Sequence, residues 1–521
     1  MVAMKRLNLK YIYQGISEKR NKKEMKKRFF WIFFSLILVA AAGLRLYDIT
    51  KFPPSLYWEE VALGYDSYSI LETGKDHHGQ PYPIVAFESF GDWKPSLYFY
   101  VLVPFIKFLG LTELAVRLPA AISGITIVIG VGALAKYFTK EKNKKTLQLV
   151  AMTVTAISPW AIQFSRAGWE VNLATALILW GVVLFMKGLE IKKKQFWFLI
   201  GSVILLSLSM YAYHSARIIA PLLGLGLAML WLKKHHKNWA QIIIPAMISL
   251  ILISPIILSL GNSQINHRFA ETSIFSDLSV IQESNLRKDR LGNTLLSRII
   301  YHRYVLFGKE ILENFFDHFN ADFLFVSGDI NPRHSIQYMG TFYHIEAIFL
   351  LLGFYTLFSR KIRYRWFLLW WLIIGIFPAT LTKTTPHALR ILPTLPVWMI
   401  LIGLGIQESF NLFKKYKKVL TVLILLVYLG EMGMFWRFYS KIYPQLYAHE
   451  WQYGYKEEMT EIEALRAQNP DEIIYVSREK GRPAMYYWFY TQTDPREVQA
   501  ENSIAKKDQG EFLEFKNLKF E

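Results

Sequence analysis

FFWIFFSLILVAAAGL, residues 29–44, is an unbroken apolar stretch that directly follows a tail dense in lysine and arginine. A signal peptide has a shorter apolar core, which ends at a small-residue cleavage site and is then removed. Because many similar apolar blocks follow along the chain, we interpret residues 29–44 as a retained signal anchor. The basic residues that precede it are Lys19, Arg20, Lys22, Lys23, Lys26, Lys27 and Arg28.

Apolar blocks of this kind recur through the chain, which is 53% hydrophobic and only 19% charged. A membrane-spanning helix needs about 20 mostly apolar residues. We therefore predict an all-α polytopic membrane protein with about eleven transmembrane helices. The predicted spans begin near Phe29, Glu113, Leu147, Val171, Phe196, Ser215, Ala240, Phe342, Trp366, Ala388 and Val419.

The net charge of +19 is spread over short basic clusters between the apolar blocks. The sequence has no separate basic domain, so we expect no nucleic-acid partner. Basic loops of membrane proteins lie on the cytoplasmic side, and eleven spans with a cytoplasmic N-terminus place every basic cluster there. This topology predicts a multi-pass protein of the plasma membrane, surrounded by membrane lipids. The clusters are Lys136–Lys145, Lys187–Lys194, Lys233–Lys237, Arg360–Arg365 and Lys414–Lys418.

The apolar stretch Pro95–Leu109 is short and would invert every later loop if it were a span. We therefore predict a juxtamembrane or re-entrant helix on the outer face. The predicted organisation is a cytoplasmic basic tail (1–28), a transmembrane domain (29–439) with two large outward loops, and an extracytoplasmic small α/β domain (440–521). The outward loops are residues 47–112 and 261–340. Within the last domain we expect helices at Lys456–Gln468 and Pro483–Tyr490 and a strand at Glu472–Ser477.

An acidic pair, Glu59 and Glu60, follows the first predicted span within the stretch YWEEVALGYDSYSIL. Residues 60–71 have the spacing of a short amphipathic helix, and both glutamates lie at its N-terminus. The helix dipole favours a carboxylate at that place. An ionised carboxylate at the membrane–water boundary can act as a general base, although acidic residues also simply cap helices.

Isolated cationic and polar residues occupy nearly every predicted outward turn, on the same side of the membrane as Glu59 and Glu60. Each of them alone could be an interfacial anchor. Together they suit a phosphate or pyrophosphate leaving group, because cations neutralise the charge that develops as its bond breaks. They are Lys94, Arg117, Arg166, Glu170, Tyr213, His214, Arg217, Arg333, His334, His387 and Arg390.

A metal site is only weakly indicated. Asp76, His77 and His78 are adjacent, and adjacent side chains seldom converge on one ion; the zinc spacing HExxH is missing from the sequence. The chain has no cysteine, which excludes disulfides and thiolate metal sites. We assign no metal ligands and no cofactor, and a divalent metal stays an open alternative. The sequence has no glycine-rich phosphate loop, which argues against a nucleotide-dependent reaction.

Several motifs, in this order, resemble the GT-C membrane glycosyltransferases, in particular the protein O-mannosyltransferases and aminoarabinose transferases of glycosyltransferase family 39 and its bacterial relatives. The resemblance covers most of the membrane region. The motifs are YWEEVALGYDSYSIL, GKDHHGQPYP, GDWKPSLYFY, GLTELAVRLPAAISG, SPWAIQFSRAGWEVN and SMYAYHSAR.

The resemblance implies a GT-C fold and an inverting sugar transfer from a polyprenyl-phosphate donor. It implies that Glu59 is the base that activates the acceptor and that Glu60 orients the base or contacts the acceptor. It associates Lys94 and Arg117 with the lipid phosphate or with the shape of the cavity, and it matches Glu170 to a position that is often acidic. The family usually has Asp-Glu where this chain has Glu59-Glu60.

The function predicted from these motifs is that of a hexosyl- or pentosyltransferase of the cell envelope. It would move a sugar from a polyprenyl phosphate to a protein, lipid or glycan acceptor at the outer face, with Lys94, Arg217 and Arg390 at the lipid phosphate. Two alternatives remain open. One is a transporter or flippase for a lipid-linked saccharide, and the other is an inactive relative that binds such a lipid.

Overall fold

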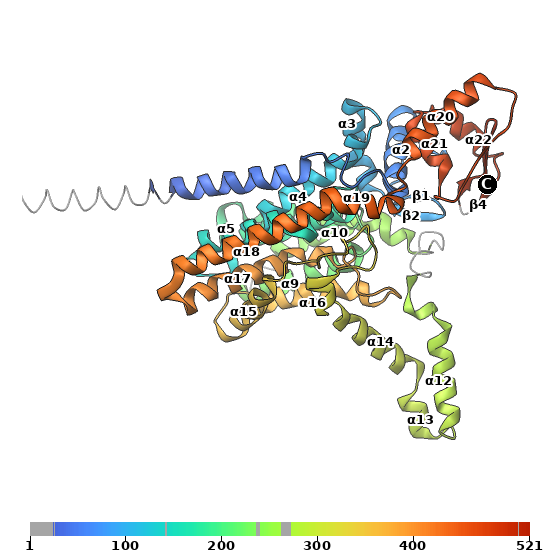
Figure 1. Cartoon of the computed structure of the whole chain (residues 1–521). Coiled ribbons are helices and arrows are strands. Elements are labelled where there is room, and N and C mark those ends of the chain that lie inside the picture. The colour runs from blue at the N-terminus through green and yellow to red at the C-terminus, as the bar shows by residue number, and fades with distance from the viewer. Residues whose placement is uncertain (1–23, 26, 141–142, 236–239, 262–271, 509) are drawn as a thin grey trace, which may run out of the picture.

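Helices form at all eleven predicted spans and build an elongated bundle (Figure 1). The computed structural model describes residues 24–25, 27–140, 143–235, 240–261, 272–508 and 510–521. Most of the predicted tail 1–28 lies outside the described residues, as do Lys237 and the first part of the predicted loop 261–340.

Seven helices in the described part of the chain are long and apolar enough to cross a membrane. They are the first apolar helix (Lys27–Leu46), α4 (Glu113–Ala135), α7 (Glu170–Glu190), α9 (Ala216–Lys234), α10 (Ala240–Ser259), α17 (Leu395–Leu412) and α18 (Lys417–Arg437).

The other four predicted spans are helices of 14 to 16 residues, which cover less than the hydrocarbon core at 1.5 Å per residue. In α5 the reason is local: the helix ends at Ile157, and Pro159 then begins the short α6. These spans and α6 are α5 (Lys144–Ile157), α6 (Pro159–Gln163), α8 (Gln195–Ser209), α15 (Glu346–Ser359) and α16 (Arg365–Thr380).

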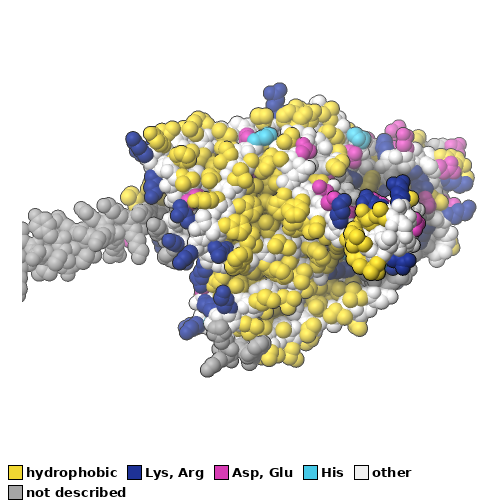
Figure 2. Space-filling model, turned by 90° about the horizontal axis from the view of Figure 1, so that it is seen from below, with side chains coloured by type: hydrophobic (Ala, Val, Ile, Leu, Met, Phe, Trp, Pro, Cys, Tyr) yellow, Lys and Arg dark blue, Asp and Glu magenta, His cyan; other side chains and the backbone are white. Residues whose placement is uncertain are grey.

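The sides of the bundle are apolar. Figure 2 shows hydrophobic side chains over its face, and lysine and arginine gathered at the end where the N-terminal helix leaves. On α10, Met247, Leu250 and Ile251 are more than half exposed, which is the surface expected of a helix that faces lipid. This pattern and the helical content confirm the predicted class, an all-α polytopic membrane protein.

The opposite end of the bundle carries the segment between the first apolar helix and α4. This segment forms α2 (Trp58–Thr73), the antiparallel hairpin β1 (Ala86–Ser89) and β2 (Asp92–Pro95), and α3 (Leu97–Leu109). With 13 residues, α3 is too short to span a membrane, as predicted for Pro95–Leu109. It is tied to α2 by the Ser67 hydroxyl, which donates to the Phe99 carbonyl at 2.9 Å.

A helical arm projects from the side of the bundle (Figure 1). It consists of α12 (Leu278–Arg290), α13 (Leu295–Ile300) and α14 (Arg303–Asp317), within the predicted polar loop 261–340. A π-helical turn over Asp322–Val326 follows, and the chain then returns to the bundle through an irregular loop.

The C-terminal residues form a small α/β domain beside α2 (Figure 1). After the short α19 (Tyr443–Leu446), it contains helices at the two predicted places. Its three-stranded sheet has the order β3-β7-β6, in which β3 and β7 are parallel. The domain shares one hydrophobic core with α2 and α3. Its elements are α20 (Tyr455–Gln468), β3 (Ile474–Val476), α21 (Pro483–Tyr490), α22 (Pro495–Glu501), β4 (Lys507–Asp508), β5 (Glu511–Phe512), β6 (Glu514–Phe515) and β7 (Leu518–Phe520).

Candidate functional site

A cavity of about 480 Å³ lies at the end of the bundle beside α2. Most of the residues predicted for the site line it, although they come from segments far apart in the chain. Those that line it are Glu59, Lys94, Glu170, Tyr213, His214, Arg217, Arg333, His334, His387 and Arg390.

Glu59 and Lys94 form an ion pair at the cavity wall. The Lys94 Nζ lies 2.7 Å from Glu59 Oε2 and 3.5 Å from Asp92 Oδ2. Glu59 stands in the first turn of α2, and Lys94 is held on β2. The Lys94 side chain is 7% exposed and that of Glu59 is 23% exposed. Thus the lysine is nearly buried, while the carboxylate remains open to the cavity.

Glu60 does not line this cavity and is completely buried. Its carboxylate accepts two hydrogen bonds from the Arg117 guanidinium, at 3.0 and 3.1 Å, and two more from the backbone N–H groups of Tyr57 and Gly168. All the lone pairs that such a carboxylate can use are therefore engaged. The position of Glu60 suits an orienting role better than contact with an acceptor.

Arg117, expected at the lipid phosphate or as a residue that shapes the cavity, and Arg166, a further site candidate, both lie outside the cavity lining. Arg117 donates to the carbonyls of Ile49, Pro53 and Ser55 as well as to Glu60. Arg166 donates to the carbonyls of Leu44, Tyr47, Asp48 and Phe52. Both guanidinium groups thus provide hydrogen-bond donors for the backbone carbonyls of the irregular segment that leads from the first apolar helix to α2. Neither side chain lines the cavity.

Aromatic side chains complete the wall around Glu59. Tyr57, Trp58 and Trp169 line the cavity, and the Arg333 guanidinium lies over the Trp58 ring at 4.8 Å and the Tyr57 ring at 5.6 Å. The backbone of Arg333 is held by Gln163, which donates to its carbonyl at 2.8 Å. Sequence patterns did not single out these three aromatic residues, because aromatic residues are common throughout the chain.

The remaining residues reach the cavity from the turn before α9 (His214), the first turn of α9 (Arg217) and the loop before α17 (Arg390). His214 Nε2 lies 2.9 Å from the Trp93 carbonyl and so ties this turn to β2. Arg217 donates to the Met210 carbonyl, and Arg390 donates to the Thr382 hydroxyl at 2.5 Å. Lys94, Arg217, Arg333 and Arg390 therefore surround one cavity that also contains an accessible carboxylate, an arrangement suited to an anionic substrate.

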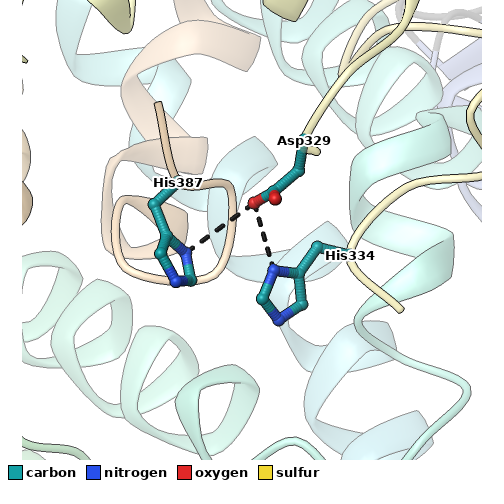
Figure 3. Close-up of side chains that lie close together, drawn as sticks. All are labelled: Asp329, His334 and His387. Carbon is teal, nitrogen blue, oxygen red and sulfur yellow. Dashed lines mark hydrogen bonds and ion pairs between the residues drawn. The ribbon is translucent and has the colours of Figure 1, made fainter. Parts of the chain in front are cut away.

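Asp329 joins His334 and His387 at the cavity wall (Figure 3). Burial opposes ionisation of Asp329, but the two imidazoles outweigh burial and hold the pKa of this carboxyl well below its usual value. Burial lowers the pKa of His387 well below the ordinary value for histidine. Asp329 was not predicted. The five-residue spacing to His334 in DINPRH was a possible signal, whereas His387 lies on another loop.

The adjacent Asp76, His77 and His78 do not converge on one point. His77 Nδ1 lies 2.6 Å from Asp66 Oδ1, His78 Nδ1 lies 3.1 Å from Asn502 Oδ1, and Asp76 accepts from the Gln80 N–H. Burial raises the pKa of Asp66 and lowers that of His77. This cluster links α2 to the C-terminal domain outside the cavity.

No protein-family model matches the sequence, and no curated protein matches it. Its fold does match solved structures. ArnT from Cupriavidus metallidurans bound to undecaprenyl phosphate matches with a TM-score of 0.51 and 13% identity, over 89% of this chain and 85% of that chain. The apo state of that protein matches with a TM-score of 0.52 and 13% identity, over 90% and 85%.

A second neighbour is the apo form of the Archaeoglobus fulgidus oligosaccharyltransferase. It matches with a TM-score of 0.53 and 12% identity, over 89% of this chain and 64% of that chain. ArnT is an aminoarabinose transferase, and both neighbours belong to one fold class. At 12–13% identity the similarity extends to the fold alone. The same fold is implied by the motifs of the membrane region. The chain therefore has the fold of the GT-C membrane glycosyltransferases.

Proposed function

We propose that this protein is a glycosyltransferase that moves a sugar from a polyprenyl-phosphate donor to an acceptor, with Glu59 as the general base. The observation that carries the proposal is the Glu59–Lys94 ion pair at the wall of a cavity rich in arginine. A solved structure with the same fold, that of ArnT, holds undecaprenyl phosphate, and a phosphate suits the cations around this cavity.

In the proposed reaction the acceptor hydroxyl gives its proton to Glu59. The acceptor oxygen then forms a bond to the anomeric carbon of the sugar. The bond between that carbon and the phosphate oxygen breaks, and the polyprenyl phosphate leaves with the electron pair. Lys94 pairs with Glu59 before the reaction and neutralises the leaving phosphate during it.

The other cavity residues divide into two groups. Arg217, Arg333 and Arg390 are proposed contacts of the donor phosphate, because their side chains line the cavity. Glu60 and Arg117 are proposed positioning residues, since their buried pair holds the start of α2 and hence Glu59. Arg166 supports the same backbone. Glu170, Tyr213 and His214 are proposed to contact the sugar or the acceptor.

A separate apolar groove of about 360 Å³ lies between α8, α9 and α10. The polar cavity is lined by Arg217 and Ile218 of α9, and the groove by Ala220, Pro221 and Gly224 one turn farther along the same helix. An isoprenoid chain needs an apolar surface of this kind. We propose that the donor phosphate lies in the cavity and that its chain extends into the groove.

The proposed location is the plasma membrane, with the basic end of the bundle in the cytoplasm and the cavity at the outer face. At the end where the N-terminal helix leaves, Figure 2 shows a group of lysine and arginine side chains, whereas at the opposite end such side chains are mixed with acidic ones; this supports the orientation. On this basis the donor enters from the outer leaflet.

The test uses purified protein reconstituted in lipid with a polyprenyl-phosphate sugar and an envelope extract as the acceptor source. The readout is release of polyprenyl phosphate. We expect Glu59→Gln to lower the rate by about 100- to 10,000-fold, because it removes a general base. Glu461→Gln, the same change at an exposed position of α20, should leave the rate unchanged.

Full activity of Glu59→Gln would exclude Glu59 as the base. Saturable donor binding without sugar release, in both the wild type and Glu59→Gln, would favour an inactive binding protein. Movement of the intact donor between leaflets would favour a flippase.

A further inference from the structure

Three side chains with nitrogen and oxygen donors converge beside the cavity. Asp329 and His334 lie on the loop that follows the π-helical turn, and His387 lies on the loop between α16 and α17. Their potential ligand atoms all lie within 4.8 Å of one another, and all three residues are buried. Figure 3 shows the Nδ1 atoms of both imidazoles directed at the same carboxylate.

The distances in this cluster are near those of a metal site. Asp329 Oδ2 lies 3.1 Å from His334 Nδ1 and 3.7 Å from His387 Nδ1. A tetrahedral zinc ion with bonds of about 2.0–2.2 Å separates its ligand atoms by roughly 3.3–3.6 Å. The distances from the carboxylate to the two nitrogens bracket this range.

His387 supplies a second, independent observation. Its Nδ1 atom is buried and has no hydrogen-bond partner within the part of the chain that the structure describes. The 3.7 Å separation from Asp329 is too long for a hydrogen bond. Buried polar atoms usually have a partner, and a metal ion between the three residues would give this nitrogen one.

The surrounding hydrogen bonds hold the cluster in place. Asp329 Oδ2 also accepts from the Ala388 N–H at 2.7 Å, and Asp329 Oδ1 accepts from the Asn331 N–H at 2.9 Å. The backbone N–H of His387 donates to His318 Nε2 at 3.2 Å. Outer contacts of this kind orient metal ligands and are typical of metal centres.

We propose that Asp329, His334 and His387 bind one divalent transition-metal ion at the cavity wall. Two imidazoles and one carboxylate suit zinc, cobalt, manganese or ferrous iron better than calcium or magnesium. Three protein ligands leave at least one coordination position open. His334 and His387 both line the cavity, so this position faces the cavity and accepts an oxygen ligand from it. The proposal is independent of the proposed sugar transfer.

The experiment measures metal binding without any donor or acceptor. The full-length protein is purified in detergent, its affinity tag is removed, and it is stripped with a chelator and titrated with Co²⁺. Visible d–d absorption reports coordination, and competition with Zn²⁺ reports relative affinity. We expect one ion per chain, and Mg²⁺ should not displace it. Asp329→Asn and His387→Ala should each weaken binding by more than the 10- to 100-fold typical of losing an outer contact.

His449→Ala is the matched control, because this histidine lies outside the cluster with its side chain 74% exposed. It should bind Co²⁺ like the wild type. A second readout is the unfolding temperature, which Zn²⁺ should raise in the wild type and in His449→Ala but not in Asp329→Asn. Asp329→Asn keeps the shape of the side chain, so it decides the outcome if His387→Ala does not fold. Failure of the wild type to bind Co²⁺, or unchanged binding in Asp329→Asn, would overturn the proposal.

Discussion

Glu59 and Glu60 are neighbours in the chain, but the start of α2 directs them into opposite surroundings. Glu59 reaches the cavity and Lys94, whereas Glu60 is enclosed with Arg117. The resembling family usually has an aspartate where this chain has Glu59, whose side chain is one methylene longer. The Glu59 carboxylate lies 2.7 Å from the ammonium group of Lys94.

The two glutamates should therefore give different phenotypes. Glu60→Gln leaves the Arg117 charge buried without its partner, which typically costs about 3–5 kcal/mol of folding free energy. We expect a clear fall in the unfolding temperature of the purified protein, measured by differential scanning fluorimetry.

Glu59→Gln serves as the control in that measurement. Its side chain is partly exposed and its partner Lys94 keeps a contact with Asp92, so its unfolding temperature should stay close to that of the wild type. Equal unfolding temperatures for Glu60→Gln and Glu59→Gln would contradict the assigned positioning role.

The sequence predicts a site residue when the residue is charged and also lies just after a predicted span on the outer side of the membrane. Glu59, Lys94, Arg217 and Arg390 follow predicted spans on one side of the membrane, and all four line the cavity. Arg117 and Arg166 show the limit of this reasoning. Their partners are mostly backbone carbonyls, and a sequence does not reveal which carbonyls an irregular segment leaves unpaired. Asp329 and His387 meet only through the tertiary fold.

At the scale of elements, the packing of α21 on α2 decides how firmly the site is held. Gly64 of α2 lies against Phe489 of α21, and a Cβ atom at Gly64 would come within 2.6 Å of the Phe489 ring and 2.8 Å of Val116. The Tyr65 hydroxyl donates to the Thr493 carbonyl, and the Tyr486 hydroxyl donates to the Leu56 carbonyl. The helices α2 and α21 are therefore in close contact, and hydrogen bonds from Tyr65 and Tyr486 join the two regions.

Gly64→Ala should loosen this contact. Overpacking costs about 1–3 kcal/mol, while the better helix propensity of alanine returns up to about 1 kcal/mol. We expect a lower unfolding temperature and faster proteolysis between α20 and α22.

Gly308→Ala provides the matched comparison for Gly64→Ala. Gly308 lies in α14 with open space around the added Cβ atom, so this change should be neutral or slightly stabilising. If the two alanine variants unfold and are cleaved alike, the α2–α21 contact does not have the importance assigned to it.

The elements themselves differ in how well the sequence predicts them. Long apolar blocks indicate the spans directly, and proline marks the start of α21 at Pro483. The arm was expected only as a polar loop. The arm contains the helix α14, whose sequence mixes charged and apolar residues. By composition alone such a stretch resembles a polar loop.

At the scale of the whole molecule, orientation follows from the distribution of charge. Lysine and arginine side chains gather at the end of the bundle where the N-terminal helix leaves (Figure 2), and the cavity lies beside α2 at the other end (Figure 1). The chain contains no cysteine, so single cysteines can report the two ends separately. Gln80 and Thr146 are both exposed and lie near opposite ends.

We expect Gln80→Cys to react with a membrane-impermeant maleimide in intact cells, and Thr146→Cys to react only after permeabilisation. Labelling detected by a gel shift provides the measurement, and the cysteine-free wild type shows the background. The reverse pattern would invert the proposed orientation and place the cavity in the cytoplasm.

The core shared by α2, α3 and the C-terminal domain has a consequence for biosynthesis. A ribosome adds about 5–20 residues per second, so α21 emerges on the order of 20 to 80 seconds after α2. During that interval the face of α2 that carries Gly64 and Tyr65 lacks its partner. A nascent chain that has just passed Arg390 already contains every cavity residue named above, yet α2 still lacks its contact with α21. The order of synthesis thus delays the full packing of α2 until the C-terminal domain has folded onto it.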